Sequence, residues 1–240
     1  MVKQEKSKLD QIREKLKANS NKKKAKILQG FFKTGIGQYA QGDIFLGISV
    51  PKTRQIAKDF LSLKKDDIIE LLKSKYHEQR LIALLILVEQ FKAADQTEKT
   101  QIYKLYIRNS KYINNWDLVD LSAPKIVGDF LFKRDRKILY KLAQSEQLWQ
   151  KRIAILATYY FIKQDDFQDT FKIAEILLKD SHDLIHKAVG WMIREVGKRN
   201  IKQTEGFLKK HYKIMPRTML RYAIEKFPEN KRQMYLKSQI

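Results

Sequence analysis

The sequence predicts an all-α protein built as an α-solenoid, a row of stacked helix pairs. Three observations support this prediction. Apolar residues recur with helical spacing along nearly all of the 240 residues, and strand-like alternation is almost absent. Only four prolines interrupt the chain, and five of the nine glycines fall within residues 30–47. Similar helical segments also return about every 35 residues.

The periodicity divides the chain into helices joined by short polar segments. Pro51 and Pro216 each stand just ahead of a helical pattern, where the first turn tolerates proline. A basic helical part (about residues 1–33) precedes a glycine-rich loop (about residues 34–50), and residues 1–240 are predicted to form a single domain. The expected helices are 7–19, 21–33, 51–62, 65–74, 77–93, 97–109, 114–132, 134–144, 147–163, 167–179, 182–198, 201–211, 216–227 and 230–238.

The helix pairs repeat in register. Arg80, Arg152, Lys187 and Arg221 each open an apolar helical run, at intervals of 72, 35 and 34 residues. The interval of 72 is two periods, and its missing middle member falls at Trp116. A period near 35 with two helices per unit is typical of HEAT-like repeats, whose equivalent positions line one surface. A chance recurrence of helices of similar length is the alternative interpretation.

The charge of the chain favours a polyanionic partner. It has 49 Lys and Arg against 27 Asp and Glu, a formal charge of +22. Residues 1–33 account for a surplus of eight, and fourteen are spread over the remainder. A cation distributed over a folded body points to nucleic acid ahead of an anionic membrane. The alternative is a lysine-rich composition without functional meaning, as in proteins of AT-rich genomes.

Several classes of site are excluded. The chain has no cysteine, which rules out disulfides and thiolate metal sites. His182 and His186 are spaced as a metal pair, but no HExxH pattern accompanies them, so no metal site is predicted. The first residues lack the apolar stretch of a signal peptide, and the longest apolar run (81–88) is too short to span a bilayer. A soluble intracellular protein is expected.

The run "NNWDLVD" (114–120) places Trp116 and Asp120 on one helical face, four residues apart. Arg152 opens the corresponding helix of the next repeat, and Trp191 lies on the one after that. Equivalent helices of a solenoid are neighbours, so the four side chains are expected to converge. Each also has a plainer interpretation: a core position for either Trp, a local cap or ion pair for Asp120, and a simple phosphate anchor for Arg152.

This grouping suits a cationic nucleotide. A purine alkylated at N3 or N7 carries positive charge and leaves without a protonating acid. Positive charge then develops on the deoxyribose, where a fixed carboxylate stabilises it and orients water. Indole faces attract cations as well.

The sequence resembles the AlkD-type DNA alkylation repair proteins, which are HEAT-like-repeat DNA glycosylases of bacteria. The resemblance spans about residues 25–230 and is carried by "NNWDLVD", "PKIVGDFL", "LWQKRIAIL", "IHKAVGWMIREVGK", "RTMLRYAIEK" and "FFKTGIGQYAQGDIFLGISVP". It implies Asp120 as the catalytic carboxylate, Trp116 and Trp191 as lesion-flanking aromatics, and Arg152 as a backbone contact. It also implies hydrolysis of the N-glycosidic bond of cationic N3- or N7-alkylpurines, without a metal or cofactor.

Further candidates are weaker. Tyr39, in the glycine-rich loop, is a candidate lesion contact, with turn packing as its alternative. Phe31 or Phe32 could take that role instead, although a hydrophobic contact that ends the preceding helix is the favoured interpretation of both. The candidate phosphate contacts are Arg80, Lys187, Arg194 and Arg221, although Arg194 also suits an ion pair with Glu195.

The expected protein is thus a monomeric, monofunctional alkylpurine DNA glycosylase that acts on damaged double-stranded DNA in the bacterial cytoplasm, at the nucleoid when bound. Two other functions remain open. One is a DNA-binding HEAT-repeat protein without catalysis, and the other is a HEAT-repeat scaffold for protein interactions.

Overall fold

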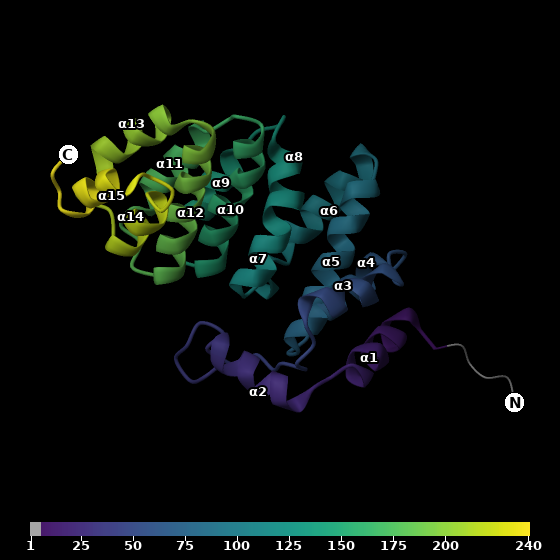
Figure 1. Ribbon diagram of the computed structural model, residues 1–240. Coiled ribbons are helices and arrows are strands. Elements are labelled where there is room, and N and C mark those ends of the chain that lie inside the picture. Colours follow the sequence, from purple (N-terminus) through teal and green to yellow (C-terminus); the bar gives the residue numbers. More distant parts are fainter. Residues whose placement is uncertain (1–5) are drawn as a thin grey trace, which may run out of the picture. The chain divides into compact units, whose positions relative to one another are not determined.

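The computed structural model describes residues 6–240, and these form an all-α fold, as predicted (Figure 1). Within this range, strand-like pairing is limited to one isolated parallel bridge between Ile44 and Tyr76. The chain forms two compact units, one ending at Ser122 and the other running from Ala123 to Ile240. The expectation of a single domain stays a prediction, and each unit is described by itself.

The first unit is built around one buried helix. Its elements are α1 (Lys8–Ala18), α2 (Lys22–Phe31), α3 (Val50–Lys58), α4 (Lys65–Leu72), α5 (His77–Ala93), α6 (Gln96–Arg108), the 3₁₀ turn η1 (Ser110–Tyr112) and α7 (Trp116–Ala123). Helix α5 contacts α1, α3, α4 and α6, and residues 77–88 are all buried. Because α5 is covered by several helices, its apolar residues are not confined to one stripe.

The glycine-rich loop between α2 and α3 is anchored to the start of α5. The Ile44 N–H donates to the Lys75 carbonyl (3.0 Å), and the His77 N–H donates to the Ile44 carbonyl (2.9 Å). Gly47 has a φ of +83°, and a Cβ at this position would lie 2.1 Å from the Asn21 carbonyl oxygen. Only glycine therefore lets the loop pass so close to the start of α2.

The second unit is a stack of helix pairs. Its elements are the π-helical turn η2 (Pro124–Gly128), α8 (Asp129–Leu131), α9 (Lys137–Ala143), α10 (Leu148–Lys163), α11 (Gln168–Leu177), α12 (Asp183–Arg199), α13 (Ile201–His211), α14 (Arg217–Ala223) and α15 (Glu229–Leu236). Helices α10, α12 and α14 pack in succession, with α9, α11 and α13 packed alongside (Figure 1). Arg152, Lys187 and Arg221 are each the fifth residue of their helix, in agreement with the predicted register.

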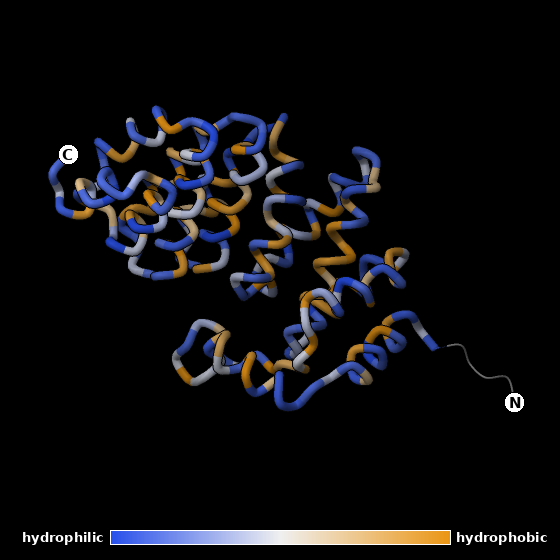
Figure 2. Tube along the Cα trace, in the orientation of Figure 1, coloured by the Kyte–Doolittle hydropathy of each residue, from blue (hydrophilic) through white to orange (hydrophobic). Residues whose placement is uncertain are grey.

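The helix expected over 114–132 is interrupted. It comprises α7, the π-helical turn η2 and the short α8. Pro124 has no N–H and its ring displaces the preceding turn, which explains the local widening. Apolar and polar residues alternate along most helices, as the colours of Figure 2 show, and this amphipathic pattern is the one from which the helices were predicted. No helix within residues 6–240 is long and apolar enough to cross a membrane.

Candidate functional site

Trp116 is the first residue of α7. The buried Asn115 precedes it, and the Asn115 Oδ1 accepts the Trp116 backbone N–H at 2.8 Å. Asp120 follows one helical turn later, so Trp116 and Asp120 share a face of α7 and are both half-buried. The predicted Trp–carboxylate pairing on one helix is therefore present.

Trp116 belongs to an aromatic cluster, defined here as Phe31, Phe32, Tyr39 and Trp116. The Trp116 ring stacks on Phe32, with centroids 5.1 Å apart and planes at 16°. Phe31 meets Trp116 edge-on at 6.0 Å, and the Trp116 Nε1–H donates to the Tyr39 hydroxyl at 3.3 Å. Phe31 is 63% exposed whereas Phe32 is 7% exposed, so the cluster reaches from the core of the unit to its surface.

Behind the cluster, His77 lies between aromatic rings and two carboxylates. Its ring stacks on Phe45 at 4.4 Å, and Phe45 in turn stacks on Phe32 at 4.9 Å. His77 Nε2 lies 2.8 Å from Asp117 Oδ2, and Nδ1 lies 3.7 Å from Asp43 Oδ2. Burial lowers the pKa of His77, but the Asp117 and Asp43 carboxylates raise it by more, so that its pKa lies above the usual 6.5.

Arg80 completes a buried charged network with His77, Asp43 and Asp117. Its guanidinium lies 2.6 Å from Asp43 Oδ2 and donates from Nη1 to the Ser74 carbonyl at 2.7 Å. Burial lowers the pKa of Arg80, an effect that Asp43 opposes. Two carboxylates thus face one arginine and one histidine, and protonation of His77 makes the network neutral. Because Arg80 is only 3% exposed, this arrangement favours a structural role, and a phosphate contact from Arg80 stays a prediction.

Asp120 lies near a second buried polar group. The Tyr106 hydroxyl is hydrogen-bonded to Ser122 Oγ at 2.9 Å. Burial raises the pKa of Tyr106, and the negative charge of Asp120 raises it further. The Asp120 carboxyl group therefore lies close enough to the Tyr106 phenol, on α6, to influence its pKa.

Trp191 lies in the second unit with a carboxylate of its own. Its Nε1–H donates to Glu195 Oε1 at 3.0 Å, one helical turn further along α12. Glu195 also accepts Lys198 Nζ at 2.8 Å and Arg194 Nη2 at 3.2 Å. Trp191 is half-buried, and its ring lies 6.1 Å from that of Tyr159. The ion pair between Arg194 and Glu195, one of the two interpretations of Arg194, is present.

The other basic candidates of this unit differ in exposure. Arg152 is 4% exposed and donates from Nη1 to the Leu184 carbonyl at 2.6 Å. Lys187 pairs with Asp183 at 2.7 Å. Arg221 is exposed, and its side chain makes no hydrogen bond or ion pair within residues 6–240. Residues at equivalent positions of the repeat therefore differ in exposure and in the contacts that they make.

Trp116 and Asp120 belong to the first unit, and Arg152 and Trp191 to the second. The convergence of these four side chains stays a prediction. Sequence reasoning missed the network formed by Asp43, His77 and Asp117 and the carboxylate partner of Trp191. The one signal for the network was the run "YHEQR" (76–80), in which three ionisable residues open an otherwise apolar helix.

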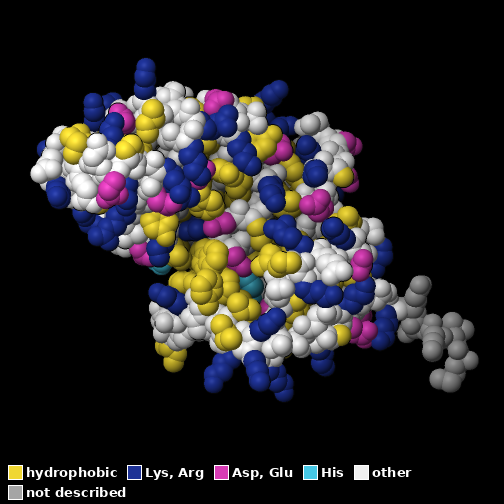
Figure 3. Space-filling view, in the orientation of Figure 1, with side chains coloured by type: hydrophobic (Ala, Val, Ile, Leu, Met, Phe, Trp, Pro, Cys, Tyr) yellow, Lys and Arg dark blue, Asp and Glu magenta, His cyan; other side chains and the backbone are white. Residues whose placement is uncertain are grey.

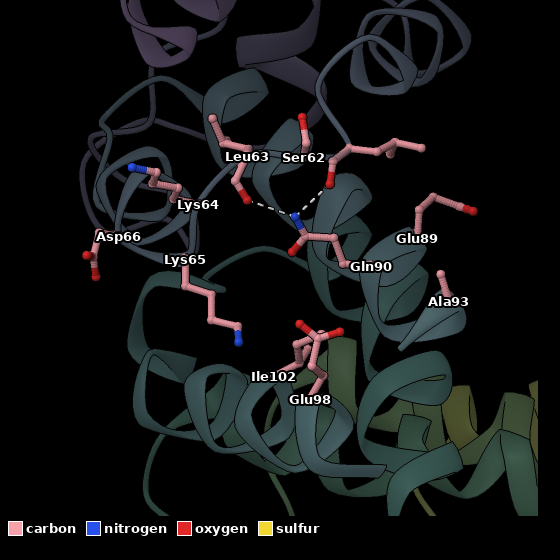
Figure 4. Close-up of a pocket in the computed structure, with 11 residues that line it drawn as sticks. Ser62, Leu63, Lys64, Lys65, Asp66, Glu89, Gln90, Ala93, Glu98 and Ile102 are labelled. Atoms are coloured by element: carbon pink, nitrogen blue, oxygen red, sulfur yellow. Dashed lines mark hydrogen bonds between the residues drawn. The ribbon is translucent and has the colours of Figure 1, made fainter. Parts of the chain in front are cut away.

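A cavity of about 540 Å³ lies beside α4, α5 and α6 (Figure 4). Gln90 donates to the Leu61 and Leu63 carbonyls there, and the lining includes both Lys65 and Glu98. The cavity contains none of the predicted site residues. Within residues 6–240, no group of three His, Cys, Asp or Glu side chains is placed to hold a metal ion.

Comparison with known proteins identifies a family and a similar fold. Residues 12–227 match the model of a family described as "DNA alkylation repair enzyme". A solved structure from Enterococcus faecalis, described as a predicted DNA alkylation repair enzyme, is similar with a TM-score of 0.67 and 16% identity. The similarity covers 88% of this chain and 98% of that one, and at this identity it shows the fold alone. No curated protein matches the sequence.

Proposed function

The chain belongs to the DNA alkylation repair enzyme family, and from this premise we propose that it is a monofunctional DNA glycosylase. The proposed reaction is hydrolysis of the N-glycosidic bond of cationic N3- or N7-alkylated purines in duplex DNA, by a monomer without a metal or cofactor. One observation carries the proposal: Trp116, held within an aromatic cluster, shares a helix face with Asp120.

The chemistry follows from the charge of the substrate. When the bond between C1′ and the purine nitrogen breaks, its electron pair neutralises the alkylated ring, and the positive charge moves to the deoxyribose. The Asp120 carboxylate stabilises that charge and orients the water that attacks C1′. The proton released by the water passes to Asp120 or to solvent. The products are the free alkylpurine and an abasic site.

The aromatic residues have a separate role. An indole face attracts a cation by about 0.5–2 kcal/mol, depending on desolvation. Trp116 is restrained by its stack on Phe32 and its hydrogen bond to Tyr39, so little conformational freedom is lost when it meets the lesion. We assign Trp191 to the second aromatic contact. The Tyr39 hydroxyl supports Trp116 by accepting its Nε1–H. We also assign Tyr39 as a further lesion contact.

In this proposal, the positive charge of the chain binds the phosphate backbone of the duplex. Lysine and arginine side chains are scattered over the visible face of both units (Figure 3). We assign phosphate contacts to Arg152, Lys187, Arg194 and Arg221, of which the exposed Arg221 is the strongest candidate. Such contacts supply affinity without sequence preference. The proposed location is the bacterial cytoplasm, at the nucleoid when the protein is bound.

The decisive experiment is base release from duplex DNA methylated at guanine N7, with the released base identified by mass. We expect release by the unmodified protein and a loss of about a hundred- to a thousandfold for Asp120→Asn, the usual effect of removing a preorganised stabilising group. Binding to undamaged duplex is expected to be unchanged. Asp66→Asn, at an exposed position of α4, is the matched control.

The outcomes separate the candidate functions. If the unmodified protein binds duplex DNA but releases no base, the non-catalytic DNA-binding function replaces this one. If it binds no DNA at any salt concentration, the scaffold function does. Full activity of Asp120→Asn would remove Asp120 from the mechanism.

A further inference from the structure

A basic cavity in the first unit lies outside the proposed catalytic site. Its volume is about 430 Å³, and it lies where α1, α2, the glycine-rich loop and the start of α5 meet. Arg13, Lys17 and Lys22 contribute its cations, Phe45 and Tyr76 its aromatic surface, and Gln79 an amide. Figure 3 shows several Lys and Arg side chains over α1 and α2, which Figure 1 locates. We call this cavity the basic pocket.

The cations of the basic pocket are poorly neutralised. Arg13 Nη1 lies 4.0 Å from Asp10 Oδ1, at the outer limit of an ion pair between exposed groups. Neither Lys17 nor Lys22 makes an ion pair within residues 6–240, whereas Lys15 on the same helix as Lys17 pairs with Asp59 at 2.7 Å. Three positive charges around one cavity, without matching carboxylates, create a positive potential inside it.

Glu78, the buried neighbour of Gln79 in the chain, already has hydrogen-bond partners. Glu78 accepts the backbone N–H groups of Leu46 and Gly47, each at 2.8 Å, and that of Ile48 at 3.2 Å. Its charge is therefore used in fixing the glycine-rich loop. The carboxylate holds the wall of the pocket in place and leaves the cations on the rim unpaired.

Gln79 supplies an observation independent of charge. Its side chain lines the pocket, and the residue is 9% exposed. A ligand oxygen in the pocket would accept the Gln79 N–H.

The start of α2 points to the same chemistry. Lys22 is the first residue of α2, Lys23 and Lys24 follow it, and the first turn has no acidic residue. Asn21 Oδ1 already accepts the Lys24 N–H. Cations are unfavourable at the positive end of a helix, whereas an anion there is stabilised by the helix dipole and the remaining N–H groups. An anion bound beside Lys22 offsets the repulsion between these lysines and the positive end of α2.

We propose that the basic pocket binds a phosphate ester carrying a sugar or base, which is the repeating unit of a nucleic-acid strand. A phosphate alone is far smaller than the cavity, whose volume lies within the range of small-ligand sites. The phosphate meets Arg13, Lys17, Lys22 and the Gln79 amide. The sugar or base covers Tyr76 and the small exposed part of Phe45, whose ring stacks on Phe32 and His77. This inference rests on the proposed function only in taking DNA as the ligand, and it does not require base excision.

The test is duplex binding over a series of salt concentrations, with an undamaged duplex as the probe. Arg13→Gln, Lys17→Gln and Lys22→Gln are combined in one variant. Its slope of log affinity against log salt is expected to fall by about 0.9 for each phosphate that the variant no longer neutralises. The matched control combines Lys92→Gln, Lys104→Gln and Arg108→Gln, which remove the same charge from exposed positions of α5 and α6 outside the pocket. We expect it to keep most of the original slope.

Gln79→Glu is the second variant. The added carboxylate lies among three cations, so the fold is retained, whereas a phosphate is repelled. Adenosine monophosphate, titrated against each variant by calorimetry, distinguishes a free nucleotide from a strand. Weaker binding of the duplex in both variants assigns the pocket to the DNA strand, and weaker binding of the mononucleotide alone assigns it to a free nucleotide. Binding of both probes indistinguishable from that of the control variant overturns the proposal. None of these readouts depends on base release, so failure of the catalytic proposal would be seen separately.

Discussion

At the scale of single residues, the position of Trp116 depends on partners distant in sequence. Phe32 supports its ring face and Tyr39 its indole nitrogen, and both come from the segment before α3. Phe45 stacks on Phe32, and His77 stacks on Phe45. The His77 ring in turn contacts the carboxylate of Asp117, which follows Trp116 in the chain. The start of α7 is thereby tied to the start of α5 through rings and charges.

His77 makes this link dependent on pH. Its pKa is raised in the folded protein, so the protonated form is favoured by folding. The resulting stabilisation is fully present below the unfolded pKa of about 6.5, and it is lost as pH rises through the higher folded value. We expect the free energy of unfolding to fall as pH rises from about 6.5 through the higher folded pKa, by about 1.4 kcal/mol for each unit of pKa difference. The charged groups that act on His77 are Asp43, Asp117 and Arg80, and Glu78 acts in turn on Arg80.

Urea denaturation at a series of pH values measures this effect, and His77→Gln should flatten the dependence. His182 provides the opposite control. Burial lowers the pKa of His182, so its contribution is lost as pH falls. His182→Asn, which offers a side-chain oxygen to the Leu184 N–H in place of Nδ1, should therefore remove a loss of stability below about pH 6.5 and leave the His77 decline above it unchanged. Identical pH dependence in the unmodified protein and His77→Gln would exclude the role assigned to the histidine.

At the scale of elements, close approach between helices fixes the second unit. A Cβ at Gly128 would lie 2.3 Å from the Ala157 carbonyl oxygen, and one at Gly190 would lie 2.4 Å from that of Met219. A glycine packed against a backbone carbonyl thus allows close packing of η2 on α10 and of α12 on α14. Gly190 directly precedes Trp191, so this packing also determines where the indole lies.

We expect Gly190→Ala to destabilise the protein by about 1–3 kcal/mol, because backbone atoms of α14 must move to admit the methyl group. Gly206→Ala is the matched control. Gly206 lies in α13 with no atom within 4 Å of the added Cβ, so alanine there should stabilise the protein by about 0.5–1 kcal/mol. Thermal and urea denaturation of both variants give the comparison. Equal stability of the two variants would contradict this account of the α12–α14 contact.

The same elements show what the sequence predicts well. The 3.6-residue spacing located the helices, and the register placed Arg152, Lys187 and Arg221 at equivalent positions. Spacing along one helix also paired Trp116 with Asp120. It carried no information on contacts between distant segments, such as Phe32 with Trp116 or Arg80 with Asp43. Burial of Arg80 and Arg152 was missed for this reason, since a charged residue opening a helix looks the same whether it faces water or a buried carboxylate.

At the scale of the whole molecule, the formal charge of +22 opposes folding by self-repulsion. Ion pairs such as Arg199 with Asp165 recover part of this energy, but exposed pairs contribute only about 0–1 kcal/mol each. A surplus of positive charge that is retained against this repulsion is understandable when the ligand is a polyanion. Stability and DNA affinity should then respond to salt in opposite directions.

We expect the melting temperature to rise as sodium chloride is added, because screening weakens the repulsion between cations. Each 1 kcal/mol gained corresponds to about 2–4 °C for a protein of this size. Over the same range the affinity for duplex DNA should fall, since counterion release drives binding less at high salt. The variant that lacks the charges of Arg13, Lys17 and Lys22 has less repulsion to screen, so its melting temperature should rise less. A melting temperature that falls with added chloride would mean that the ion pairs outweigh the repulsion, and that the excess charge does not oppose folding.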